Sequence, residues 1–82
     1  MNVTILYFAA VRDLVGQDEE RVGLPASITT IGALAGYLMK LHAPLAGRLA
    51  SVRFARNEEF AQDVDPVADG DVIALIPPVA GG

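Results

Sequence analysis

The residues best suited to take part in a reaction lie at the end of the chain, in the run Pro77-Pro78-Val79-Ala80-Gly81-Gly82. Prolines favour an extended path, and glycine has no side chain, so this ending fits a channel too narrow for a Cβ atom. Six extended residues reach roughly 20 Å, far enough to place a terminal carboxylate inside the active site of another protein. We therefore predict a folded domain over residues 1–76 and an extended, flexible tail over residues 77–82.

The stretch before the tail supports a functional role for it. Residues 71–76 are apolar and β-branched, which is typical of a central strand, and the prolines end the strand because they donate no ladder hydrogen bond. A frayed terminus or an expression remnant is the alternative explanation of a Gly-Gly ending. Frayed ends seldom follow a buried strand directly through two stiff prolines, so the pattern favours a functional tail.

The rest of the chain offers few side chains for catalysis or metal binding. Its 82 residues include no cysteine and one histidine, which excludes a thiolate nucleophile, a disulfide framework and a multi-histidine metal site. We predict that His42 is a surface or helix-capping residue. Four aspartates between positions 63 and 71 suggest a calcium loop, but Ala74 stands where an EF-hand requires glutamate. The aspartates instead predict a turn, and we expect no bound cofactor and no metal.

The charge and hydropathy of the chain bear on its partners. Ten acidic and six basic residues give a net charge of −4, which disfavours nucleic acid and favours a basic protein surface. The hydrophobic fraction of 52% is high for a small domain, so some apolar surface is expected to meet a partner. No stretch approaches the ~20 apolar residues of a membrane span, and no cationic leader precedes the first apolar residues. We expect a cytoplasmic protein without membrane association.

Residue periodicity predicts the secondary structure. Alternating apolar residues predict strands over residues 2–8, 21–24, 51–56, 60–63 and 71–76. Apolar residues at helical spacing predict a main helix over residues 30–42, and a short second helical segment follows over residues 44–50. Two segments connect the first two strands. Residues 9–16 are predicted to form a turn or 3₁₀ segment that ends at Gly16 with positive φ, and residues 17–20 are predicted to form a charged loop.

This order of elements predicts an α+β fold. The compact solution is a mixed five-stranded sheet with the main helix on one face. The first and last strands lie side by side and parallel in the middle of the sheet, because the main helix then forms a right-handed crossover. This arrangement is the β-grasp, or ubiquitin-like, fold.

The last strand is predicted to present a docking surface next to the tail. Ile73 and Leu75 are expected to pack under the helix, which turns the alternate residues to the opposite face. There they would join Leu6 and Phe8 of the first strand. The alternative is that the short helical segments cover this face. The predicted partner-binding residues are Phe8, Val72, Ala74 and Ile76, continued by Pro77, Pro78, Val79 and Ala80. Arg53 and Arg56 are either solvated or pair with acidic partner residues.

Over essentially its whole length, the chain resembles the small subunits of molybdopterin synthase, the MoaD-type ubiquitin-like sulfur carriers, and more distantly the thiamine sulfur carrier. The resemblance rests on Tyr7-Phe8-Ala9, on residues 11–16, on Val52-Arg53 with Ala55 and Asn57, on residues 69–72 and above all on residues 77–82. The Pro-Pro-Val-small-Gly-Gly ending resembles the molybdopterin branch rather than the thiamine branch. The chain departs from the family pattern at Arg56 and Glu58, which flank the asparagine of a hairpin, and at Leu75 and Ile76, where aromatic residues are common.

The resemblance implies a non-catalytic sulfur-donor subunit of a transferase complex. An E1-like activating enzyme would use ATP to adenylate Gly82, which follows Gly81 in the reactive ending. A sulfur donor protein would then convert the adenylate to a thiocarboxylate. The large subunit of molybdopterin synthase would hold cyclic pyranopterin monophosphate, which receives the sulfur to form the dithiolene of molybdopterin.

Two alternatives remain open at this point. The same chemistry could serve thiamine or cysteine synthesis. The chain could also be a ubiquitin-like protein modifier or a pure interaction module, in which the terminal carboxylate joins a lysine amine or has no chemical role.

Overall fold

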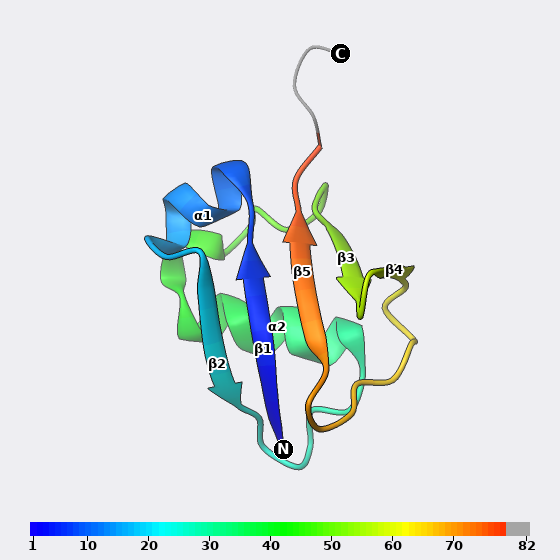
Figure 1. Ribbon diagram of the computed structural model, residues 1–82. Helices are drawn as coiled ribbons and strands as arrows, with labels where there is room; N and C mark the ends of the chain where they lie inside the picture. The colour runs from blue at the N-terminus through cyan, green and yellow to red at the C-terminus, as the bar shows by residue number, and fades with distance from the viewer. Residues whose placement is uncertain (79–82) are drawn as a thin grey trace.

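A computed structural model describes residues 1–78 of the chain. Five strands form one sheet in the order β2-β1-β5-β3-β4. The elements in chain order are β1 (Asn2–Tyr7), α1 (Ala9–Val15), β2 (Glu19–Gly23), α2 (Ile31–Leu41), η1 (Ala43–Leu45), β3 (Arg53–Arg56), β4 (Glu59–Ala61) and β5 (Val72–Ile76). Figure 1 shows β1 and β5 in the middle of the sheet, with α2 packed behind it.

The predicted central pair is confirmed. β1 and β5 are parallel, with Ile5 opposite Ile73 and Tyr7 opposite Leu75, while β2 and β3 pair antiparallel on either side. Because the two strands are parallel, both end at the same edge of the sheet. That edge carries α1 and the start of the tail, as Figure 1 shows at the top of the molecule.

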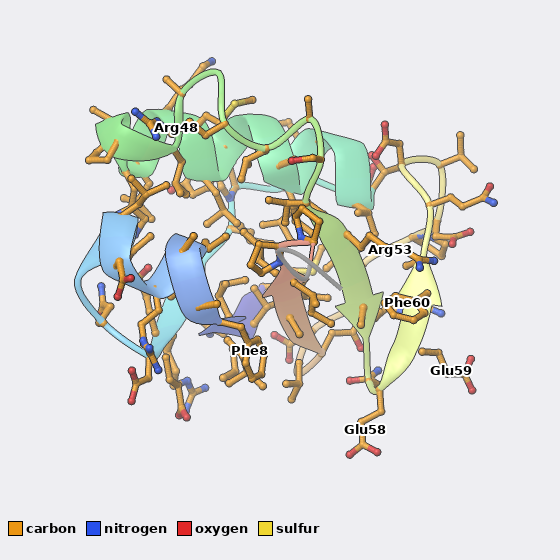
Figure 2. The ribbon with its side chains drawn as sticks, turned by 90° about the horizontal axis from the view of Figure 1, so that it is seen from above. Phe8, Arg48, Arg53, Glu58, Glu59 and Phe60 are labelled. Atoms are coloured by element: carbon orange, nitrogen blue, oxygen red, sulfur yellow. The ribbon has the colours of Figure 1, made fainter. Side chains whose placement is uncertain are left out.

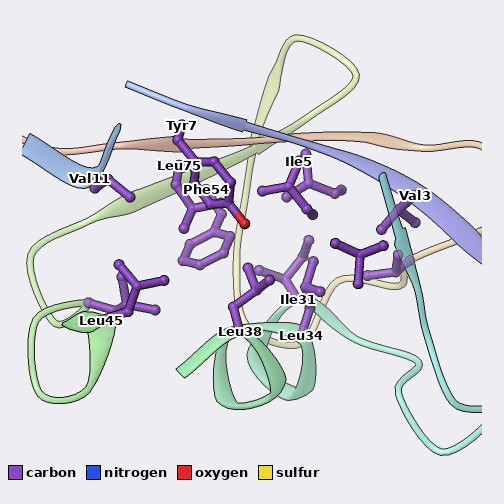
Figure 3. Close-up of a cluster of buried hydrophobic side chains, with 14 of the residues drawn as sticks. Val3, Ile5, Tyr7, Val11, Ile31, Leu34, Leu38, Leu45, Phe54 and Leu75 are labelled. Carbon is purple, nitrogen blue, oxygen red and sulfur yellow. The ribbon is translucent and has the colours of Figure 1, made fainter. Parts of the chain in front are cut away.

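The core forms where alternate strand residues meet one stripe of α2. Ile5, Ile73 and Leu75 are fully buried on the helix-facing side of the sheet. They pack against Leu34 and Leu38 of α2, which are also fully buried (Figure 3). α2 begins at Thr30, whose Oγ1 accepts a hydrogen bond of 3.2 Å from the backbone N–H of Ala33. This packing fixes which face of the sheet is left uncovered.

Two predicted helical or turn segments are corrected by the structure. Residues 9–15 form an α-helix, α1, where a turn or 3₁₀ segment was expected, because the buried Val11 anchors the segment to the core. Gly16 caps α1 at φ 87°, so the positive φ predicted there is confirmed. The second helical segment is a single 3₁₀ turn, η1, rather than a helix over residues 44–50. The domain therefore has two short helical segments besides the main helix.

The second strand also begins earlier than predicted. β2 starts at Glu19, so Glu19 and Glu20 lie in the sheet and not in a charged loop. The pairing of Glu19 with Leu6 and of Glu20 with Ile5 extends the hairpin toward α1. Among the described residues no helix is long and apolar enough to cross a membrane.

Candidate docking face and tail

Four neighbouring strands align a row of apolar side chains on the sheet face opposite α2, which we call the open face. The register pairs Leu6 with Ala74, Ala74 with Ala55, and Ala55 with Phe60. Residues directly opposite one another on adjacent strands point to the same face of a sheet. The row therefore runs across β1, β5, β3 and β4, with two alanines in the middle and larger side chains at both ends.

This alternation of small and large side chains hollows the open face into a groove. The groove has a volume of about 450 Å³. Its lining residues are Leu6, Phe8, Ala55, Asn57, Glu58, Phe60, Val72, Ala74 and Ile76. Figure 2 shows Phe8 and Glu58 on the side of the sheet away from α2. The groove is open, so the alternative that short helical segments cover this face is excluded.

The sequence-predicted docking residues fall into three groups. Phe8 and Val72 are exposed, at 46% and 38%, and line the groove together with the half-buried Ala74 and Ile76. Pro77 and Pro78 follow β5 and line a separate hollow beside α1 and residues 47–52. Val79, Ala80, Gly81 and Gly82 lie outside the described residues. The predicted face is thus brought together, and its role in partner binding stays a prediction.

Sequence reasoning missed one of the largest contributors to the groove, Phe60. Its side chain is 59% exposed and forms the wall opposite Phe8. The alternation pattern places Phe60 at the start of the strand predicted over residues 60–63 and gives it no role in docking. A two-residue hairpin turn at residues 57–58 was the available signal, because that turn places Phe60 directly across from Ala55.

The hairpin turn keeps a defined geometry despite the unusual residue at position 58. Asn57 and Glu58 both adopt positive φ, 51° and 71°, as a type I′ turn requires. The Asn57 side chain accepts a 2.9 Å hydrogen bond from the backbone N–H of Val72 and donates one of 3.0 Å to Asp71. The turn is therefore fastened to the start of β5, beside the groove.

The two arginines of this hairpin are engaged within the chain. The guanidinium carbon of Arg53 lies 3.9 Å from the centre of the Phe60 ring, a cation–π contact. Arg56 donates a hydrogen bond from Nη1 to the backbone oxygen of Pro66. Neither arginine is simply solvated, and Arg53 covers one face of the aromatic wall of the groove.

The aspartate-rich segment acts as the predicted turn. Asp65 accepts a 2.7 Å hydrogen bond from the backbone N–H of Gln62, and Asp71 accepts one of the same length from Ala68. Asp69 accepts a 2.7 Å bond from the backbone N–H of Asn2. Within residues 1–78 no group of three or more His, Cys, Asp or Glu side chains is arranged to hold a metal ion.

A small polar network lies near the β2 edge of the sheet, at the other end of the strand order from β4. The Tyr7 hydroxyl donates a 2.7 Å hydrogen bond to Oε1 of Glu20, and Nε2 of His42 lies 2.6 Å from the same oxygen. A carboxylate can only accept, so Nε2 carries the proton. His42 caps the C-terminus of α2 as predicted, but its ring is only 16% exposed and is not a surface group.

Burial and hydrogen bonding in this network together shift the pKa values of Tyr7 and Glu20. Burial, together with the adjacent Glu20 carboxylate, raises the pKa of Tyr7 far above its ordinary value. Burial by itself would raise the pKa of Glu20 as well. The hydrogen bonds from Tyr7 and His42 outweigh that effect and hold the pKa of Glu20 below its ordinary value. The network therefore joins β1, β2 and the end of α2 through an ionised carboxylate.

Comparison with known proteins places this architecture in a family. The family model described as the ThiS family matches residues 5–82, which includes every residue that lines the groove and the Gly-Gly ending. This chain belongs to the ThiS family. A curated relative of this ThiS-family chain, the molybdopterin synthase sulfur carrier subunit of Chlamydomonas reinhardtii, is 34% identical over 84 residues, and the match covers 100% of both chains. The resemblance drawn from the sequence is confirmed.

Solved structures confirm the fold of this ThiS-family chain. SAMP1 from Haloferax volcanii superposes with a TM-score of 0.88 at 28% identity, and the match covers 100% of both chains. A putative molybdopterin converting factor subunit 1 from Pyrococcus furiosus has a TM-score of 0.86 at 30% identity, covering 96% of this chain and 99% of its own. The predicted ubiquitin-like β-grasp is therefore confirmed.

Proposed function

We propose that this ThiS-family chain is the sulfur carrier subunit of a molybdopterin synthase. The observation that carries the proposal is the full-length similarity to curated molybdopterin synthase sulfur carrier subunits. The geometry agrees with it, because Ile76 both lines the groove and ends β5. A protein that covers the groove thus also meets the chain where it leaves the sheet at Pro77.

The proposed chemistry takes place on the carboxylate of Gly82. A carboxylate is a poor electrophile, so an E1-like activating enzyme transfers AMP from ATP to it and releases pyrophosphate. A sulfur donor protein then displaces AMP and leaves a thiocarboxylate on Gly82. Sulfur is a softer and stronger nucleophile than the oxygen it replaces, and this makes the ending reactive.

The proposed acceptor is cyclic pyranopterin monophosphate held by the large subunit. Docking through the groove would bring the tail into that subunit, where a closed site keeps water from hydrolysing the reactive intermediates. A dithiolene contains two sulfur atoms, so two deliveries complete one product. In this scheme the chain contributes the reactive group and the positioning, and the large subunit contributes the catalytic side chains.

The direct test combines intact mass spectrometry with an assay of pterin sulfuration. After incubation with ATP, the activating enzyme and a sulfur donor, the chain should gain the mass difference between sulfur and oxygen, localised to Gly82. The charged carrier should then convert cyclic pyranopterin monophosphate in the presence of the large subunit. A chain lacking Gly82 should fold normally and fail in both assays, and a truncated chain that still sulfurates the pterin would refute the proposal.

A second candidate function is favoured by the similarity to SAMP1, named in a related structure as small archaeal modifier protein 1. In that case activated Gly82 would form an amide with lysine side chains of other proteins. Adducts that depend on Gly82 and survive thiol reagents would favour this function over sulfur transfer.

Sulfur delivery to thiamine or cysteine synthesis is the remaining alternative. It shares the thiocarboxylate but not the acceptor. Co-purification with a thiazole synthase, in place of a pterin-binding subunit, would identify that pathway.

A further inference from the structure

Glu58 occupies a backbone position that suits it poorly. It is the second central residue of the β3–β4 turn and adopts φ 71°, a conformation that glycine reaches without strain and that a glutamate side chain disfavours. The two-residue turn itself needs no carboxylate, because its hydrogen bonds to Asp71 and Val72 come from Asn57. A residue that strains a turn without stabilising it points to a role outside the fold.

The carboxylate of Glu58 stands at the groove and is not engaged within the chain. It is the one charged residue among the described residues that line the groove. No salt bridge or side-chain hydrogen bond of Glu58 occurs within residues 1–78. The arginines of the same hairpin are held elsewhere, Arg53 on the Phe60 ring and Arg56 on the oxygen of Pro66.

The direction of the Glu58 side chain fits an external contact. Figure 2 shows it projecting away from the sheet on the same side as Phe8, whereas Glu59 points sideways from the edge strand. Alternation of side chains along the strand explains why Glu59 does not face the groove. Phe60 and Ala55 share the open face, so the neighbouring pair, Glu59 and Arg56, is turned away from it. Two neighbouring glutamates with the same charge thus differ in whether they line the groove.

We propose that Glu58 is a recognition residue, whose carboxylate pairs with a lysine or arginine that borders the apolar segment a partner protein places in the groove. The inference rests on the proposed function, in which the partner is the large subunit of molybdopterin synthase. The net charge of −4 favours a basic partner surface. Docking also removes water from the rim of an apolar groove, so an ion pair there gains strength that an isolated surface pair lacks.

The test measures binding of the purified large subunit to four forms of the full-length chain by surface plasmon resonance. These are the unchanged chain, Glu58→Gln, Glu58→Gly and the matched control Glu59→Gln. Removal of the Glu58 charge should weaken binding about fivefold at low salt, mainly through slower association, and the deficit should shrink at high salt. Glu59→Gln should bind as the unchanged chain does.

The glycine variant separates recognition from a purely structural role. Glycine relieves the positive φ, so Glu58→Gly should be at least as stable as the unchanged chain while binding more weakly. If Glu58→Gln and Glu58→Gly bind the large subunit with the same affinity as Glu59→Gln, the assignment of Glu58 is overturned. The proposed function is then left intact. If the unchanged chain does not bind the large subunit at all, the proposed function itself fails, and this inference fails with it.

Discussion

Replacement of Phe60 by alanine tests the open face most directly. Phe60 forms one wall of the groove and is 59% exposed, so its ring is available to a partner and contributes little to the core. The variant Phe60→Ala should fold with the same secondary structure and bind the large subunit much more weakly. The guanidinium of Arg53, which stacks on this ring, simply becomes solvated.

The magnitude follows from the exposed area. A phenylalanine presents about 200 Å² of accessible surface, of which roughly 120 Å² remains exposed at 59%. At about 25 cal/mol per Å², complete coverage of this area by a partner contributes up to about 3 kcal/mol to the free energy of binding. The dissociation constant should therefore rise by as much as roughly 150-fold.

Isothermal titration calorimetry of Phe60→Ala against the large subunit, at a temperature where both proteins are folded, measures this loss. Val64→Ala is the matched control, because Val64 is 78% exposed and does not line the groove. A dissociation constant for Phe60→Ala no higher than that of Val64→Ala would refute the assignment of the open face as the docking surface. Circular dichroism of both variants establishes that they are folded.

Three further predictions address the turn, the groove floor and the edge network. Glu58→Gly should raise the free energy of urea unfolding by about 0.5–1 kcal/mol, because glycine relieves the positive φ at this position; an unchanged or lower value would contradict the strain. Ala74→Trp should fill the groove floor and abolish co-elution with the large subunit on gel filtration without unfolding the domain, and retained co-elution would count against docking there. The pKa of Glu20 is lower in the folded chain than in the unfolded chain, so its contribution to stability should be complete above the ordinary glutamate pKa and disappear as the pH falls below that value through the lower pKa of the folded chain. Glu20→Gln keeps an acceptor for Tyr7 but cannot ionise, so urea unfolding at several pH values should show a weaker dependence in this range, and identical curves would contradict the assignment.

Much of the fold was predictable because its signals are local. Alternation over residues 2–8 and 71–76 predicted two strands that are apolar on both faces, and helical spacing over residues 30–42 predicted the covering helix. Only a few chain paths bury such elements together, and the right-handed crossover rule selects among them. The same alternation placed Ala74 and Ile76 on the face away from the helix, which the structure confirms.

The errors occurred where tertiary contacts override local preference. Residues 9–15 carry three apolar residues at helical spacing, but the segment is too short for that pattern to separate a helix from a turn. In the fold Val11 is buried, and Leu14 and Val15 pack against the core, which stabilises α1. The charges of residues 17–20 predict a solvated loop that includes Glu20. In the fold it lies in β2 and accepts hydrogen bonds from Tyr7 and His42, residues that stand 13 and 22 positions away. Partners at such separations leave no mark in a local pattern.

The order of the strands and the main helix, and which residues of two strands share a face, follow from the amino-acid sequence, as does the presence of the Gly-Gly ending. Each of these depends on the types and spacing of neighbouring residues. The alignment of β5 with β1 and with β3 joins segments far apart in the chain and follows only from the tertiary structure. That register sets Ala74 beside Ala55 and Ala55 beside Phe60, and so makes a groove with an alanine floor and an acidic rim at Glu58. The local turn at residues 57–58 fixes the β3–β4 pairing, whereas packing of the core fixes the register between strands that are distant in the chain.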